Sequence, residues 1–235
     1  MRALLLCAGL GTRLRPLTLE TPKCLLPINN KPLLDIWLDA LFSVAEIERV
    51  AINIHYKKEQ FLTHIKNSPY RNKIDVFEEN ILQGTARTLF QNRSNFRKSK
   101  DFLVIHADNF YTGDIKELIV AHKNRPENCV MTMLLFETPY PQNCGIVELD
   151  KNETVVNFHE KVPSPPSNLA NGAIYCLSQQ ALDSLEEHQI DISTDVIPTL
   201  IGKIYTVKTQ GKIIDIGTPR TYKEANTFAK VIENL

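Results

Sequence analysis

Short apolar runs alternate with amphipathic stretches along the first three quarters of the chain, and this alternation restricts the fold more than any other feature. Residues 3–7 read as a buried strand, residues 34–42 place apolar side chains at helical spacing, and residues 50–54 read as the next strand. Strands that alternate with helices are typical of a parallel sheet covered by helices. The sequence therefore predicts an α/β fold.

The same patterns predict the remaining elements. Further strands are expected at residues 74–77, 102–105, 130–136, 171–177, 204–207 and 213–216, and helices at residues 85–90, 115–122 and 222–232. Residues 146–149 and 155–158 are separated by a short polar stretch, which predicts an antiparallel excursion, and prolines then mark a surface loop. At about 150 residues per domain, we expect the 235 residues to form one domain with this excursion as an insertion.

The composition excludes several classes of protein. With 43% hydrophobic and 23% charged residues, the chain is typical of a globular protein with a sizeable core. Its 27 basic and 27 acidic residues give a formal net charge of zero, so no global field attracts nucleic acid or an acidic membrane. We therefore expect neither as a partner, and an anionic ligand requires a local cluster of positive groups.

The sequence also predicts where the protein resides. The apolar run of residues 3–8 is far shorter than the roughly 20 residues of a membrane span and too short for a secretory leader. The five cysteines are dispersed and contain no Cys-x-x-Cys pair, which indicates reduced, buried thiols. No repeat of about 20 to 50 residues is visible, so no second module is expected. These features predict a cytoplasmic protein.

A glycine-rich, basic segment follows the first strand directly. Gly9 and Gly11 let backbone N–H groups approach phosphate oxygens, Arg13 can grip a phosphate with two hydrogen bonds, and Lys23 adds a compact charge. The Walker pattern GxxxxGK[ST] is absent, and Leu14 replaces the third glycine of a dinucleotide fingerprint. The segment predicts an anion-binding loop of another kind; for the two glycines alone, a tight turn with solvated charges is an equal alternative.

Residues 6–27 resemble the signature of the nucleoside-diphosphate-sugar pyrophosphorylases, the sugar-1-phosphate nucleotidyltransferases. The matching strings are AGxGTRLxPLT and then PKxLxP, and the resemblance continues to about residue 222. It implies that Arg13 and Lys23 are catalytic, since in that family the arginine and lysine hold and activate the triphosphate. It also implies that the loop binds nucleotide through Ala8, Gly9, Gly11 and Thr12.

Two later segments match the family in the expected order. Gln83, Gly84 and Thr85 lie between a predicted strand and a helix and resemble the base-binding loop. The amide of Gln83 suits a base edge, and Gly84 permits close approach of a flat ring. Asp108 ends a buried strand, where open α/β sheets place their ligand crevice, and its carboxylate is a hard oxygen ligand for Mg²⁺. Taken alone, Gln83 is more simply a surface residue at a helix start, and Asp108 could equally be a helix cap or a turn residue.

Asp215 belongs to a segment, DIGTP, that resembles the family's Asp-x-Gly-Thr-Pro, whose aspartate is the second metal ligand. Its alternative role is to cap the last helix. The family usually has Gly-Asp at the first metal position, whereas this chain has Ala107-Asp108, which retains the carboxylate and loses backbone freedom. The resemblance implies a Mg²⁺ cofactor on Asp108 and Asp215; no zinc-ligand spacing or nucleophile motif competes with it.

The segments around Gly145, Glu160, Lys161 and Asn171 resemble the sugar-binding half of the family. Glu160 can accept hydrogen bonds from sugar hydroxyls, Lys161 can neutralise the sugar phosphate, and Asn171 can donate and accept. On the sequence alone, an exposed Glu–Lys ion pair is the simpler interpretation. The resemblance places a nucleotide-binding part at about residues 1–138 and a sugar-binding and closing part at about residues 139–235.

The fold implied by the resemblance is a doubly wound, mostly parallel α/β sheet, Rossmann-like and of the GT-A nucleotidyltransferase type, with a small antiparallel insertion over the sugar. The implied reaction joins a nucleoside triphosphate to a sugar 1-phosphate and releases pyrophosphate. The segments at residues 144–150, 159–161, 168–172 and 193–198 look most similar to short mannose-type and manno-heptose 1-phosphate guanylyltransferases, and this resemblance favours GTP.

Two alternatives stay open at this point. One is a thymidylyl- or uridylyltransferase acting on a glucose or N-acetylhexosamine 1-phosphate. The other, of a different class, is a nucleotide-sugar sensor or assembly subunit without turnover, since a fold does not guarantee activity. The sequence leaves the oligomeric state open, and a homo-oligomer is compatible with it.

Overall fold

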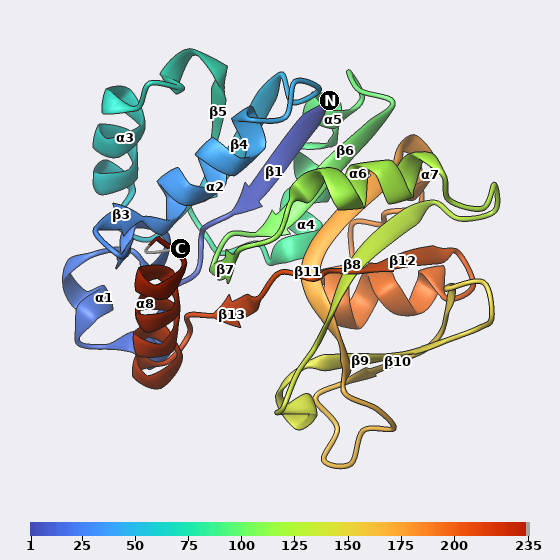
Figure 1. Cartoon of the computed structure of the whole chain (residues 1–235). Coiled ribbons are helices and arrows are strands. Elements are labelled where there is room, and N and C mark those ends of the chain that lie inside the picture. The colour runs from blue at the N-terminus through green and yellow to red at the C-terminus, as the bar shows by residue number, and fades with distance from the viewer. Residues whose placement is uncertain (234–235) are drawn as a thin grey trace. The chain divides into compact units, whose positions relative to one another are not determined.

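The structure, a computed structural model, describes residues 1–233 (Figure 1). They form two compact units, each built from several stretches of chain. The N-terminal unit comprises residues 3–82 and 106–112 and the chain from residue 212, and the central unit comprises residues 1–2, 83–105 and 113–211. The expected boundary near residue 138 lies inside the central unit, and the expectation of a single domain stays a prediction.

Parallel strands form the sheet of the N-terminal unit. The neighbours, in order, are β1 (Arg2–Leu6), β4 (Arg49–Ile54) and β5 (Ile74–Glu78). β4 and β5 pair in parallel, from Val50 opposite Ile74 to Ile54 opposite Glu78. β1 and β4 are buried along almost their whole length, which explains why both read as continuous apolar runs in the sequence.

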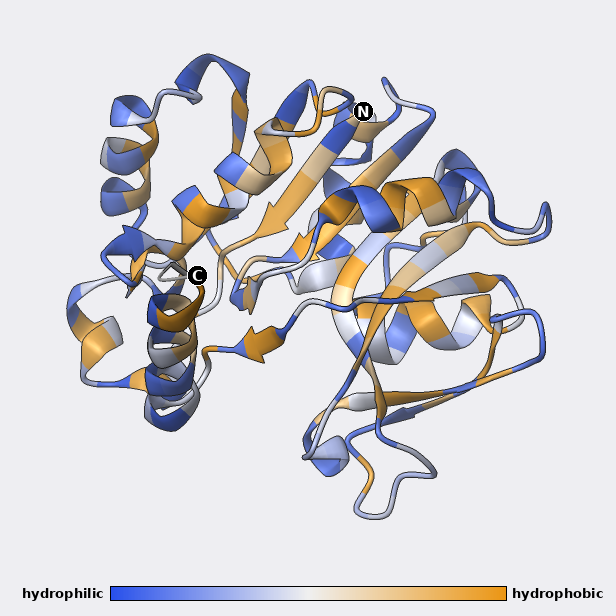
Figure 2. Cartoon of the chain, in the orientation of Figure 1, coloured by the Kyte–Doolittle hydropathy of each residue, from blue (hydrophilic) through white to orange (hydrophobic). Residues whose placement is uncertain are grey.

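Two helices accompany these strands, α2 (Leu33–Phe42) before β4 and α3 (Lys58–Asn67) between β4 and β5. In Figure 2 both helices carry hydrophilic and hydrophobic residues side by side, as amphipathic helices do. The buried positions of α2 are Leu33, Leu34, Trp37, Leu38 and Leu41. α3 was not predicted, because it buries only Phe61 and Ile65, too few apolar residues for a helical period to stand out.

The rest of the N-terminal unit consists of short elements and one long helix. The short elements are η1 (Thr12–Leu14), α1 (Leu17–Glu20), η2 (Lys23–Leu25), β2 (Pro27–Ile28), β3 (Lys31–Pro32) and η3 (Arg71–Lys73). β7 (Asn109–Tyr111) pairs antiparallel with β13 (Ile213–Asp215), which brings residues 213–215 beside residues 109–111. Helix α8 (Pro219–Glu233) follows, and the hydroxyl of Tyr222 donates to the carbonyl of Pro27 at 2.8 Å.

The sheet of the central unit is organised around β11 (Leu169–Ser178). This strand pairs antiparallel with β6 (Asp101–His106) and β8 (Met131–Glu137), and β8 pairs in parallel with β12 (Ile204–Lys208). β9 (Gly145–Leu149) and β10 (Val155–Glu160) form an antiparallel hairpin that meets β11 where Ile146 pairs with Ala170. The hairpin confirms the predicted antiparallel excursion.

Helices and helical turns complete the central unit: α4 (Thr85–Gln91), α5 (Arg93–Phe96), α6 (Ile115–Lys123), η4 (Pro141–Asn143), α7 (Gln179–Asp183), η5 (Ile192–Val196) and η6 (Ile197–Leu200). Asp114 caps α6 by accepting a hydrogen bond from the backbone N–H of Lys116 at 2.9 Å. The predicted α/β class, a mostly parallel sheet with helices and small antiparallel sheets, is confirmed.

Two further expectations can be compared with residues 1–233. Within this range no helix is both long enough and apolar enough to cross a bilayer. The five cysteines are free thiols, and Cys7, Cys24, Cys129 and Cys176 are buried as expected. Cys144 differs because it is only half-buried, in the connection between η4 and β9.

Candidate active site

The N-terminal unit brings Lys23, Asp108 and Asp215 together, and we call these three residues the carboxylate–lysine cluster. Lys23 begins the helical turn η2, Asp108 lies between β6 and β7, and Asp215 ends β13. The pairing of β13 with β7 sets Asp215 opposite Asn109, and the backbone N–H of Ile216 donates to the carbonyl of Asp108 at 3.2 Å. A backbone ladder therefore fixes the two aspartates side by side.

One ammonium group bonds to both carboxylates of the cluster. Lys23 Nζ donates to Asp108 Oδ2 at 2.8 Å and to Asp215 Oδ1 at 2.9 Å. The Lys23 side chain is only 8% exposed, whereas those of Asp108 and Asp215 are 40% and 51% exposed. The cluster therefore has a buried ammonium group, and its two carboxylates are open to a ligand.

The charges in the cluster stabilise one another. Burial alone would lower the pKa of Lys23, but the carboxylates of Asp108 and Asp215 outweigh burial and raise it. For Asp108 the directions are reversed. Burial alone would raise its pKa, but the positive charge of Lys23 outweighs burial and lowers it. The lysine is therefore protonated and Asp108 ionised at neutral pH.

Arg13 lies at the edge of the cluster. Its Nη2 is 3.6 Å from Asp215 Oδ2, and its side chain is 68% exposed, so most of its hydrogen-bonding capacity is available to a ligand. A Cβ added to Gly217 would lie 2.7 Å from Arg13 Nη2 and 2.9 Å from the Asp215 carboxylate oxygens. Gly217 was not predicted as a site residue, although its place in the DIGTP segment was a signal. The missing side chain leaves room for Arg13 and Asp215 to approach each other.

The glycine loop has a fixed shape beside the cluster. Gly11 has a positive φ of 63°, and an added Cβ would lie 2.8 Å from Thr18 Cγ2 and 3.4 Å from Lys23 Cβ. The Thr18 hydroxyl donates to the carbonyl of Gly11 at 2.7 Å, which holds the turn closed. Ala8 is buried, Thr12 is exposed, and a Cβ on Gly9 would meet nothing within 4 Å. Gly9 therefore lines open space, as a loop that receives an anion must.

The two carboxylates fit a divalent cation whose remaining coordination sites are filled by water and a phosphate ligand. Residues 1–233 contain no group of three or more His, Cys, Asp or Glu side chains placed to hold a metal ion. Mg²⁺ is usually bound through one or two carboxylates together with water and substrate phosphates. Asp108 and Asp215 both bond to a single cationic nitrogen, so the two carboxylates face a common point that a cation could occupy. The cluster therefore fits Mg²⁺ that is bound together with a phosphate ligand.

The central unit holds the predicted base-binding residues. Gly84 precedes α4 with a positive φ of 87°, and Thr85 begins the helix. Gln83 is half-buried, and its Oε1 accepts a hydrogen bond from Gln91 Nε2 at 3.2 Å. Gln83 is therefore oriented by Gln91, the last residue of α4, and it stays partly open to solvent.

The same unit gathers the predicted sugar-binding residues at one end of the β9–β10 hairpin. Gly145 pairs with Glu160, and Lys161 Nζ lies 2.8 Å from Glu160 Oε1. An added Cβ on Gly145 would lie 2.7 Å from Glu160 Oε2, so glycine leaves room for that carboxylate. Asn171 follows the residue of β11 that meets the hairpin, and its Nδ2 donates to the hydroxyl of Tyr175 at 2.8 Å. The structure brings these four residues together, while their roles stay predictions.

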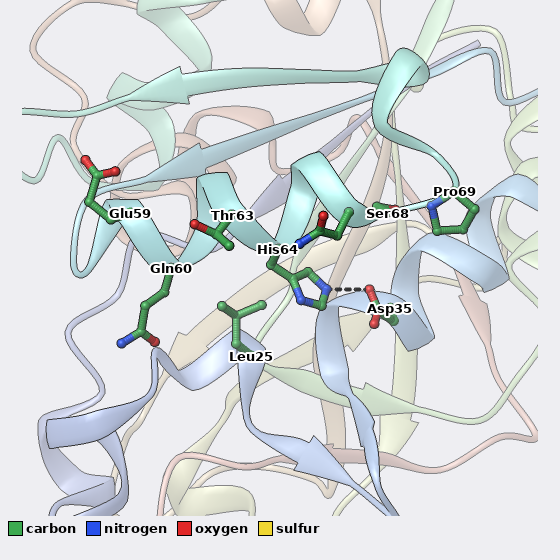
Figure 3. A pocket seen from close by; sticks show the side chains of 9 residues that line it. Leu25, Asp35, Glu59, Gln60, Thr63, His64, Ser68 and Pro69 are labelled. Atoms are coloured by element: carbon green, nitrogen blue, oxygen red, sulfur yellow. Dashed lines mark hydrogen bonds and ion pairs between the residues drawn. The ribbon is translucent and has the colours of Figure 1, made fainter.

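A surface pocket of about 550 Å³ lies elsewhere in the N-terminal unit. Figure 3 shows its lining, in which His64 of α3 points at Asp35 of α2 and Leu25 lies beside them. The pocket contains none of the predicted site residues, and the chemistry of phosphate binding is absent from it because its charged residues are mainly acidic. We therefore place the candidate active site at the carboxylate–lysine cluster.

The chain is similar to known proteins over nearly its whole length. A sequence model of the family described as nucleotidyl transferase matches residues 2–231. The chain is 32% identical over 243 residues to the "Bifunctional protein GlmU" of Methanococcus aeolicus, covering 100% of this chain and 55% of that protein. It is 31% identical over 226 residues to the "Mannose-1-phosphate guanylyltransferase catalytic subunit beta" of Drosophila melanogaster, covering 94% of this chain and 60% of that protein.

A solved structure shares the fold over almost the whole length of both chains. It is a Bacillus anthracis protein described as a "Putative Glucose-1-Phosphate Thymidylyltransferase" in complex with a sucrose, with a TM-score of 0.85 and 22% identity. The match covers 97% of this chain and 95% of that one. By contrast, the chain spans only about half to three fifths of the length of the two curated relatives.

Proposed function

Because this chain belongs to the nucleotidyl transferase family, we propose that it transfers a nucleoside monophosphate from a nucleoside triphosphate to a sugar 1-phosphate. The products are a nucleoside-diphosphate sugar and pyrophosphate. The observation that carries the proposal is the carboxylate–lysine cluster, in which Lys23 bonds to both Asp108 and Asp215 beside the glycine loop. Two anionic substrates can meet only where such a concentration of charge and backbone donors opposes their repulsion.

The reaction is a direct displacement at phosphorus. A phosphate oxygen of the sugar 1-phosphate attacks the α-phosphorus, a new oxygen–phosphorus bond forms, and the bond from that phosphorus to the β-phosphate bridging oxygen breaks. Pyrophosphate leaves with the bonding electrons. The attacking oxygen is already anionic, so no side chain has to remove a proton, and alignment with charge relief supplies the catalysis.

The residues of the N-terminal unit act on the triphosphate. Lys23 is held protonated by its two carboxylate partners and offers its charge to the phosphates. Arg13 is largely exposed and can bind a phosphate with two hydrogen bonds. Asp108 and Asp215 would hold Mg²⁺, which neutralises phosphate charge when it is bound.

The residues of the central unit act on the base and the sugar phosphate. Gln83 would read a base edge, with Gly84 and Thr85 shaping the loop around it. Glu160 and Asn171 would bind sugar hydroxyls. Lys161 would turn from its ion pair with Glu160 to the sugar phosphate, an exchange that costs little because its side chain is 65% exposed.

Within this reaction class we propose GTP and a mannose or manno-heptose 1-phosphate as substrates. The resemblance of residues 144–150, 159–161, 168–172 and 193–198 supports this choice, and the Drosophila relative is named for guanylyl transfer to mannose 1-phosphate. A thymidylyl- or uridylyltransferase acting on a glucose or N-acetylhexosamine phosphate is the alternative, since the structural relative is named for a thymidylyl transfer.

A substrate matrix tests the proposal. Purified protein with Mg²⁺ is mixed with each common nucleoside triphosphate against mannose, manno-heptose, glucose and N-acetylglucosamine 1-phosphates, and pyrophosphate release is followed. We expect the highest kcat/KM for GTP with mannose or manno-heptose 1-phosphate. A higher kcat/KM for dTTP or UTP would overturn the substrate choice alone, and no release with any pair would overturn the reaction.

A further inference from the structure

The loop of Gln83, Gly84 and Thr85 packs against residues 190–195, which we call the Asp191 turn. The backbone N–H of Ala86 donates to the carbonyl of Ile190 at 2.9 Å. A Cβ added to Gly84 would lie 2.5 Å from that same carbonyl oxygen. The two backbones therefore touch at Gly84, and the position of the loop depends on the position of the turn.

Side chains lock the loop to the turn. The Thr85 hydroxyl donates to Asp191 Oδ2 at 3.0 Å and accepts a hydrogen bond from the backbone N–H of Ile192 at 2.8 Å. The Thr85 hydroxyl thus uses its hydrogen and one of its two lone pairs for hydrogen bonds to the turn. Thr85 and Asp191 are far apart in the sequence, which is why no local pattern predicted their contact.

The Asp191 turn is itself firmly braced. Asp191 Oδ1 accepts from the backbone N–H groups of Ser193 at 2.8 Å and Thr194 at 3.3 Å, which caps η5. Asp195 Oδ2 accepts from the backbone N–H groups of Ile190 at 2.7 Å and Asp191 at 2.9 Å. The carboxylates of Asp191 and Asp195 therefore both bond to the backbone of the turn and hold it in one conformation.

We propose that Asp191 is a positioning residue for the nucleotide: through Thr85 it holds the Gly84 loop in the shape that receives the base. This inference rests on the proposed function, because it takes residues 83–85 as the base-binding loop. In this proposal Asp191 acts through the loop, because its Oδ2 accepts from the Thr85 hydroxyl and its Oδ1 from the backbone of the turn. Its loss lowers the fraction of protein with a competent loop, which weakens nucleotide binding by that fraction.

The first experiment compares Asp191→Ala with a matched control, Asp114→Ala. Asp114 is also a capping aspartate of the central unit, but its partner is Lys116 on α6. Hydrogen exchange is measured over residues 83–88, and KM for the triphosphate and kcat are measured with the best substrate pair. We expect Asp191→Ala alone to speed exchange at Ala86 and to raise KM about tenfold, with kcat changed less than about twofold.

A second experiment separates positioning from direct contact. Thr85→Val removes the hydroxyl at nearly constant shape, and Thr85→Ser keeps it. We expect Thr85→Ser to raise KM for the triphosphate less than Thr85→Val does, and Thr85→Val to raise it about as much as Asp191→Ala. The double variant Thr85→Val/Asp191→Ala is expected to raise KM no more than either single variant. Effects on KM that multiply in the double variant would overturn the proposal, because the two residues would then act separately.

Two further results would overturn it. In the first, Asp191→Ala shows the same hydrogen exchange and the same KM as the wild type. In the second, Asp191→Ala shows faster hydrogen exchange but an unchanged KM, so that Asp191 has a purely structural role. If the wild type turns over no substrate pair, the proposed function fails on its own. Calorimetric titration with GTP then replaces KM in the same comparison, and equal affinities of wild type and Asp191→Ala would overturn the inference.

Discussion

Lys23 bonds to both acidic side chains of the candidate site. Its ammonium group is buried and bonds to Asp108 and Asp215, the two carboxylates that would hold Mg²⁺. A divalent cation must replace this group or share the carboxylates with it. A triphosphate offers Lys23 other anionic partners, so nucleotide binding and cation binding are expected to favour each other.

This competition predicts the behaviour of Lys23→Met, which keeps a long side chain without the charge. In the absence of nucleotide, we expect this variant to bind Mn²⁺ at least about tenfold more tightly than the wild type does. The reason is that the positive charge of Lys23 no longer competes with the cation for the two carboxylates. Electron paramagnetic resonance of free Mn²⁺ gives the affinity. Lys31→Met is the control, since Lys31 also pairs with an aspartate, Asp39, outside the cluster. Equal Mn²⁺ affinity in Lys23→Met and wild type would contradict the competition.

Base selection is predicted to depend on Gln83. Its amide can donate and accept toward a base edge, and Gln91 holds it in place through a hydrogen bond of 3.2 Å. We expect Gln83→Ala to reduce the preference for the favoured triphosphate, measured as the ratio of kcat/KM between GTP and dTTP. Gln91→Ala is expected to produce a smaller change in the same direction. A ratio that Gln83→Ala leaves unchanged would remove Gln83 from base recognition.

At the scale of elements, one ion pair links α3 to α2 beside the surface pocket of Figure 3. His64 Nε2 lies 2.7 Å from Asp35 Oδ1, and the hydrogen bond to Asp35 raises the pKa of His64 although burial opposes it. A histidine whose pKa is higher in the folded state stabilises the fold fully below its unfolded pKa. That contribution is lost as the pH rises through the folded pKa.

The ion pair predicts a pH-dependent effect of His64→Gln, which keeps a hydrogen-bond donor and removes the titratable charge. The wild type is expected to exceed the variant in free energy of unfolding by about 1 kcal/mol or less at about pH 5, and by less at about pH 9. Urea unfolding at the two pH values measures the difference. A difference that grows with pH would show that the pair does not stabilise the fold in this way.

The elements that could be predicted from the sequence are those with a long apolar signal. The strands at residues 50–54 and 102–105 and the helix at residues 34–42 all bury continuous or periodic apolar residues, and β4, β6 and α2 confirm them. α3 has a weak apolar period and β7 is only three residues long, so neither left such a signal. The short elements depend on tertiary neighbours, which local patterns do not contain.

At the scale of the whole chain, the residues predicted from motifs fall into two groups, one in each unit. The motifs indicated Asp108 and Asp215 as partners, and the β7–β13 ladder explains how they meet. Gly217 was part of a recognised segment, but its role in leaving room for Arg13 and Asp215 required coordinates. Asp191 could not be predicted at all, because its partner Thr85 comes from a distant part of the chain.

The central claim is that the carboxylate–lysine cluster performs nucleotidyl transfer. The most direct test is the steady-state rate of pyrophosphate release by Lys23→Ala and Asp215→Asn, with folding checked by circular dichroism and the best substrate pair from the matrix. We expect each variant to lose about a hundredfold or more in kcat, the scale of removing one preorganised charge-stabilising group. Near-wild-type rates in both folded variants would contradict the account.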